Sequence, residues 1–148
     1  MCRLLLCLVL FLIFSIHSGL SYGQTTKLID EKNISQIRII RGPMTAQTQT
    51  SISCDEFDSF GSFLEFRTIN DKKKIQRIIS YINASKNANG YGVDVRFKIL
   101  INYKPTKMAD TVCFAYTTIF SYKGEVRALN SRDLIDFVEN LEMDKRNK

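Results

Sequence analysis

Residues 93–103 carry the strictest alternation of apolar and polar side chains in the chain. The odd positions are apolar and the even ones mainly polar, with Leu100 the exception. Side chains point alternately to the two faces of a strand. The pattern therefore predicts a strand with one face on a core, while Asp94, Arg96 and Lys98 face water.

Weaker alternation predicts strands on both sides of this one. Towards the N-terminus we expect a hairpin of two strands over residues 35–40 and 48–54, joined through a turn at Gly42-Pro43, and a possible third strand over 64–67. Towards the C-terminus we expect strands over residues 111–121 and 125–129. Residues 111–121 are apolar on both faces, so the pattern leaves open which face is buried. Because short turns join antiparallel strands, residues 93–129 should form a meander.

Two stretches show the spacing of amphipathic helices. In the first, isoleucines recur at i, i+3, i+4 and i+7, with Asn70 as the expected N-cap and a glycine-containing stop over residues 87–92: Ile75, Ile78, Ile79 and Ile82. The second follows a cap at Asn130 or Ser131, and its apolar stripe comprises Leu134, Ile135, Val138 and Leu141. Each helix needs an apolar surface to bury its stripe.

The order of elements is strand, strand, a possible strand, helix, three strands and helix. The simplest fold is α+β: a single antiparallel sheet of about five strands with two helices packed on one face, a two-layer sandwich. We expect this domain to span residues 35–143, after a flexible lead over 24–34 and before a charged tail over 144–148.

The N-terminus has the three parts of a secretory signal peptide. Arg3 precedes an uncharged apolar run over residues 4–16, and Ser21 and Gly23 are small residues at the −3 and −1 positions of a cut before Gln24. An uncleaved membrane anchor is the alternative, but a stable span needs about 20 apolar residues. A lipoprotein site at Cys7 is rejected because Leu6 precedes it, where a small residue is needed. The sequence predicts a cleaved signal over residues 1–23 and a secreted or periplasmic protein without a stable membrane span.

Cleavage would remove the only histidine, His17. Without histidine a chain cannot build a Ser-His-Asp triad or a Cys-His dyad, and it has no imidazole ligand for zinc, copper or iron. It also lacks a side chain that ordinarily titrates near neutrality. We therefore expect no enzyme activity, catalytic residue, cofactor or metal. Nucleic acid is not an expected partner, because the basic cluster at residues 72–74 and Arg77 lacks interleaved aromatics and reads as a solvated helix face.

Three short motifs remain. Cys54 and Cys113 are the two cysteines of the expected mature chain, and export favours a disulfide between them over two unpaired core cysteines. The acidic run Asp55, Glu56 and Asp58 could suggest a glycosidase-type acid–base pair or a calcium loop, but its spacing favours a polar connection. Asparagine glycosylation acceptor patterns occur at Asn33 and Asn83.

These features favour a small exported binding or interaction module for a protein, peptide or surface ligand, possible roles being an inhibitor or immunity factor. A basic stripe across neighbouring strands is the candidate binding face, although the same residues could be ordinary solvent side chains: Arg38, Arg96, Lys98 and Arg127. The alternative is a small-ligand carrier or an enzyme that relies on carboxylates and tyrosines. A deep apolar pocket under the sheet would favour the alternative, whereas a filled core would oppose it.

Overall fold

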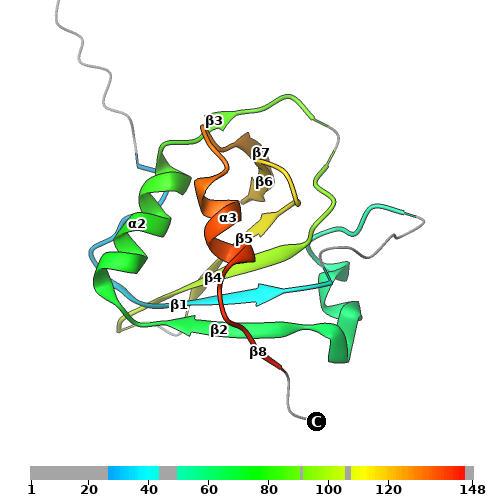
Figure 1. The fold of residues 1–148 in the computed structure, drawn as a ribbon. Coiled ribbons are helices and arrows are strands. Elements are labelled where there is room, and N and C mark those ends of the chain that lie inside the picture. The colour runs from blue at the N-terminus through cyan, green and yellow to red at the C-terminus, as the bar shows by residue number, and fades with distance from the viewer. Residues whose placement is uncertain (1–26, 44–49, 91, 106–107, 146–148) are drawn as a thin grey trace, which may run out of the picture.

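The computed structural model describes residues 27–43, 50–90, 92–105 and 108–145. Figure 1 shows one sheet with two helices lying in front of it. The strands follow the order β3-β7-β6-β5-β4-β1-β2-β8, and every pair is antiparallel. In chain order the elements are β1 (Ile34–Arg41), η1 (Glu56–Phe63), β2 (Glu65–Ile69), α2 (Lys72–Asn83), β3 (Lys86–Asn87), β4 (Phe97–Tyr103), β5 (Ala109–Phe114), β6 (Ile119–Tyr122), β7 (Glu125–Ala128), α3 (Asp133–Glu139) and β8 (Asp144–Lys145).

The α+β class and the single antiparallel sheet are confirmed, but the element count was too low. Within the described residues the sheet has eight strands where about five were expected, and two of them, β3 and β8, have only two residues each. Besides α2 and α3 there is a third helical element, the 3-10 helix η1. Strands of two residues leave almost no periodic signal, so sequence patterns miss them.

The expected N-terminal hairpin is wrong. β1 pairs with β2 on one side and with β4 on the other, and residues 50–54 contain no strand; Thr48 lies outside the described residues. The Ile52 carbonyl accepts one isolated hydrogen bond, from the Val95 amide, and the Ile52 amide donates to the Asp94 carboxylate. β1 instead takes apolar partners, such as Ile99 and Ile69, that bury more surface than the small polar side chains near residue 50 can.

The helices α2 and α3 cover the surface of the sheet that we call the helix-side face. All four isoleucines of the predicted stripe are buried there, together with three residues of α3. The caps differ from the prediction: Asp71, not Asn70, accepts the amide of Lys74 at 2.8 Å, and Arg132 precedes α3. Arg41 fastens α3 to the sheet, because its guanidinium donates to the carbonyls of Val138 and Glu139 and also pairs with Glu65.

The other surface of the sheet, which we call the opposite face, is not simply open to water. Residues 50–64, here termed the covering segment, pack η1 against one end of this face, beside the start of β2 (Figure 1). Together with residues of the sheet and of the approach to β4, the covering segment forms a second, smaller core of buried residues: Ile40, Phe57, Leu64, Val95 and Cys113. The two-layer sandwich thus gains a partial third layer, because the aromatic side chains of the connection need an apolar surface.

The ends of the domain are more ordered than the sequence suggested. Ile29, expected in a flexible lead, is only 1% exposed, and the Asn83 side chain hydrogen-bonds to both its amide and its carbonyl. At the other end, β8 pairs with β2, so Asp144 and Lys145 belong to the sheet instead of a frayed tail. The expected strand over residues 111–121 is two strands, β5 and β6. In the described part of the chain no helix is both long and apolar enough to cross a membrane.

Candidate functional site

The structure does not bring the predicted basic stripe together. Lys98 pairs across the sheet with Ile40 and Cys113, which places it on the opposite face, and Arg38 lies on that face too. Arg127 pairs with Phe120 and therefore lies on the helix-side face. Side chains on the two faces of one sheet cannot form a single surface.

Two of the four residues are also buried. Arg96 and Lys98 are each 7% exposed, although the alternation of residues 93–103 predicted that they face water. That prediction is wrong because β4 begins only at Phe97 and because the covering segment lies over this part of the face. Local alternation reports one apolar face, but it cannot report a segment that arrives from elsewhere.

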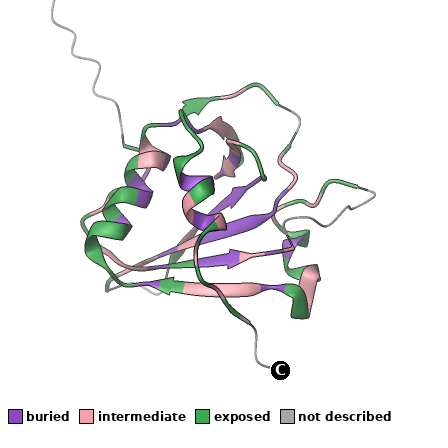
Figure 2. Ribbon diagram, in the orientation of Figure 1, coloured by how far each residue is buried: buried purple, intermediate pink, exposed green. Residues whose placement is uncertain are grey.

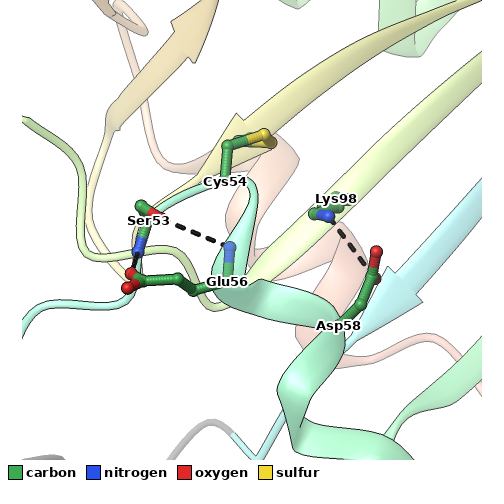
Figure 3. The surroundings of a disulfide bond; sticks show 6 residues. Ser53, Cys54, Glu56, Asp58 and Lys98 are labelled. Carbon is green, nitrogen blue, oxygen red and sulfur yellow. Dashed lines mark hydrogen bonds and ion pairs between the residues drawn. A yellow bond between two sulfur atoms is a disulfide. The ribbon is translucent and has the colours of Figure 1, made fainter.

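The buried charges hold the covering segment in place. The Arg96 guanidinium lies 2.6 Å from the Asp94 carboxylate, which in turn accepts the amide of Ile52. The Lys98 ammonium lies 3.4 Å from the Asp58 carboxylate and 5.2 Å from the centre of the Phe57 ring. Buried charges persist only when they are paired. Here the Asp94 and Lys98 side chains each also contact the covering segment, through the Ile52 amide and the Asp58 carboxylate. Figure 3 shows Lys98 and Asp58 facing each other beside the disulfide.

The predicted disulfide between Cys54 and Cys113 is confirmed, with 5.8 Å between the two Cα atoms. Cys113 lies in β5 as expected, whereas Cys54 lies in a turn before η1 and not at the end of a strand. The bond therefore joins the covering segment to the middle of the sheet. It does not join two strands of that sheet.

The acidic run serves local structure. The Ser53 amide donates to the Glu56 carboxylate at 3.0 Å, and the Glu56 amide donates to the Ser53 hydroxyl at 3.2 Å, which is a capping box (Figure 3). The hydrogen bond from the Ser53 backbone, followed by the one from its side chain, lowers the pKa of Glu56. Asp58 is committed to Lys98. Within the described residues no three acidic, cysteine or histidine side chains gather as metal ligands would.

A second polar cluster lies at the rim of the helix-side face. The Tyr103 and Tyr122 hydroxyls donate to one oxygen of Asp110 at 2.8 and 2.7 Å, and the Lys123 ammonium lies 3.5 Å from the other oxygen. Burial, reinforced by donation to Asp110, raises the pKa of both tyrosines. Burial alone would raise the pKa of Asp110, but the tyrosine hydroxyls and the Lys123 charge lower it overall. Neither the carboxyl pKa nor the tyrosine pKa is therefore shifted towards neutral pH.

Two members of the predicted stripe remain, and of these Arg127 stabilises the fold. Its guanidinium donates to the side chain and carbonyl of Ser85 and to the side chain of Asn87, which fastens β3 to β7. Arg38 is the exposed member, and its guanidinium lies 4.5 Å from the centre of the Phe66 ring.

The two glycosylation acceptor patterns differ in the fold. Asn33 is exposed, whereas the Asn83 amide nitrogen donates to the carbonyl of Ile29 at 3.0 Å. Ser85, the third residue of the second pattern, is 8% exposed and bonded to Arg127. A glycan on Asn83 would disturb these contacts, whereas one on Asn33 would extend into solvent.

A hollow of about 360 Å³ lies where the segment before β1, the start of α2 and the end of β4 meet. We call it the lysine hollow. Three lysines from these three parts of the chain line it together with six other residues: Lys32, Lys72, Lys104, Glu31, Ile34, Ser35, Asn70, Ile75 and Gln76. Sequence reasoning missed it. Only Lys72 stood in a recognised cluster, and no sequence signal links it to Lys32 or Lys104.

The second hollow, also of about 360 Å³, lies against α2 and α3 and is wide open to solvent. Acidic, basic and apolar side chains line it: Arg77, Asp133, Asp136, Phe137, Asn140 and Leu141. Comparison with known proteins provides no further guide, because no family model, curated protein or solved structure matches the chain.

Proposed function

We propose that the mature chain is a non-catalytic binding module that acts outside the cytoplasm and recognises a protein, peptide or surface ligand. The observation that carries this proposal is the filled interior. Three fully buried rings stack between the helices and the sheet, with 4.7 Å between the centres of Phe97 and Phe114 and 4.9 Å between those of Phe114 and Phe120. A small-ligand carrier needs an enclosed apolar space, and side chains occupy that region here.

The carboxylate- and tyrosine-dependent enzyme is supported less well. Its residue types meet around Asp110, but general acid–base catalysis works best when the pKa of the catalytic group lies near the working pH. The pKa of Asp110 is lowered, mainly by its hydroxyl donors acting against burial, and the pKa of Tyr103 is raised by burial. At neutral pH the carboxylate stays charged and the phenols stay protonated, which suits a structural role.

Three exposed hydrophobic side chains offer contact points for a macromolecular partner. Phe63 in the covering segment is 72% exposed, Met108 is 76% exposed and Tyr116 is 46% exposed. Aromatic residues and methionine are enriched in protein interfaces. These positions are therefore suitable places to probe for a partner.

The first test is native mass spectrometry of protein produced with its own leader and recovered from outside the cytoplasm. We expect a chain that begins at or near Gln24, contains one disulfide and retains no small apolar molecule. Recovery of intact Met1 in a membrane fraction would contradict export by a cleaved signal. A retained stoichiometric lipid or metabolite would favour the carrier.

The second test is photo-crosslinking in the source organism, with a photoreactive phenylalanine at Phe63 or Tyr116. We expect at least one position to give a discrete adduct with a macromolecule. The control carries the same label at Ser80, which lies on the exposed side of α2. Phe114 would not serve as a control, because it is fully buried. Absence of a discrete adduct from both probe positions would count against a macromolecular partner.

A further inference from the structure

The lysine hollow has an excess of positive charge that the rest of the fold does not neutralise. Lys32, Lys72 and Lys104 line it, and none of their ammonium groups is paired with a carboxylate of the described residues. Glu31 is the acidic residue of the lining, and its carboxylate lies 3.8 Å from the Lys27 ammonium. Three lysines against one glutamate leave the lining with an excess of positive charge, which attracts an anion.

The hollow also contains neutral groups that can orient a ligand. The side-chain amides of Asn70 and Gln76 line it and have no hydrogen-bond partner among the described residues. The Ser35 hydroxyl already donates to the carbonyl of Asn102 at 3.1 Å, so it can only accept. The start of α2 contributes little positive potential, because the Asp71 carboxylate caps it. The attraction for an anion therefore comes from the lysines.

We propose that the lysine hollow binds a phosphate monoester, carried either by a soluble molecule or by a lipid headgroup. The proposal goes beyond the macromolecular binding function proposed above, because it assigns a ligand class to a separate site that can bind with or without that partner. Lysine binds phosphate as a point charge, and three lysines around one hollow favour a dianion over a single carboxylate. The volume of about 360 Å³ falls at the lower end of the range for small-molecule sites. The lining contains no aromatic ring on which a base could stack, which disfavours single-stranded nucleic acid.

The experiment is a titration of the oxidised mature chain with inorganic phosphate, followed by two-dimensional ¹H–¹⁵N NMR. Sodium chloride at matched ionic strength corrects for screening. We expect saturable shifts that concentrate on the amides around Lys32, Lys72 and Lys104. The double variant Lys72→Gln/Lys104→Gln should weaken binding by about 25-fold, at about fivefold for each lost ion pair.

Lys86→Gln provides the matched control. It removes one positive charge, as each half of the double variant does, from an exposed lysine in β3, which follows the C-terminal end of α2. The hollow lies at the N-terminal end of this 12-residue helix, about 18 Å away along its axis. Lys86→Gln should change phosphate affinity by less than about twofold. Thermal unfolding of each variant checks that the fold is unchanged.

Two further arms identify the source of the phosphate. A soluble sugar phosphate tests the free ester, and vesicles of phosphatidylcholine with or without phosphatidic acid test the lipid. Binding to either source that depends on Lys72 and Lys104 supports the site. Shifts that spread over all exposed lysines, or an equal loss of affinity in the double variant and in Lys86→Gln, would overturn it. If phosphate does not bind but the photo-crosslinks form, the phosphate site alone is disproved. If phosphate binds but no crosslink forms, the macromolecular partner is contradicted.

Discussion

The two faces of the sheet are covered by different means. On the helix-side face, α2 and α3 bury regular apolar stripes against phenylalanine and isoleucine side chains. On the opposite face, the covering segment buries a smaller core and is also held by the Cys54–Cys113 disulfide and by the ion pair between Lys98 and Asp58. Figure 2 shows the buried stretches of both helices and of the central strands.

The difference shows how a segment built around one short 3-10 helix can become a stable layer. An amphipathic helix hydrogen-bonds its own backbone and presents an apolar stripe, so burial alone can fix it. The covering segment has fewer apolar contacts to offset its loss of conformational freedom. A covalent bond and paired charges supply part of that stabilisation. Substitutions on each face should therefore differ in how much they destabilise the fold.

Phe114→Ala tests the helix-side face. The side chain is fully buried and stacks with two other rings, so its removal leaves a cavity between the sheet and its helices. The free energy of unfolding, measured by urea denaturation, should fall by about 3–5 kcal/mol. Phe63→Ala in the covering segment is the control, because that ring is 72% exposed and its loss should cost little. Similar losses for the two variants would contradict the assignment of the main core.

Cys54→Ala with Cys113→Ala tests the covering segment. The bond joins residues 59 positions apart, and its loss should lower the free energy of unfolding by about 2–4 kcal/mol. Hydrogen exchange should show loss of protection first around Phe57 and Leu64, while the amides of α2 keep theirs. Reduction of the wild-type protein should reproduce this pattern. A uniform loss across both faces would mean that the two layers unfold as one unit.

Asp58→Asn tests the ion pair between Lys98 and the covering segment. It removes the ion-pair partner of the Lys98 ammonium, whose side chain is only 8% exposed. Asp58 itself is 71% exposed, so solvent screens the pair and the expected loss is only about 1 kcal/mol. Asp55→Asn, an exposed neighbour, is the matched control and should have no measurable effect. An equal effect of the two substitutions would show that net charge matters and the Lys98 contact does not.

The pH dependence tests the polar cluster at the rim of the helix-side face. Because the pKa of Asp110 is lowered in the fold, its contribution is present above the ordinary aspartate pKa of about 4 and is lost as the pH falls through the folded value. The pKa of Tyr103 is raised, so its contribution is present below about pH 10 and is lost as the pH rises through the folded value. Asp110→Asn should flatten the acid limb of the stability profile and reduce only part of the alkaline limb, because burial still raises the pKa of Tyr103; each change should be less than about 1 kcal/mol. A profile unchanged by this substitution would show that the cluster contributes nothing to stability.

Elements with a regular spacing of apolar residues could be predicted from the sequence alone. The four isoleucines of α2, the three buried residues of α3 and the odd positions of β4 all lie where their spacing predicted. The α+β class and the disulfide also followed, because amphipathic elements need one shared core and because an even pair of cysteines in an exported chain favours a bridge. The signal peptide lies outside the described residues and stays a prediction.

What covers the opposite face, and which charged side chains pair, became visible only in the folded structure. Arg96 and Lys98 looked like solvent residues from their local pattern, yet the covering segment buries both. The register of β7 places Arg127 on the helix-side face. Lys32, Lys72 and Lys104 come from three distant parts of the chain and line one hollow only in the folded structure. Periodicity describes how one element relates to one surface. Contacts between elements depend on strand order and register, which follow from burying the whole set of apolar faces at once.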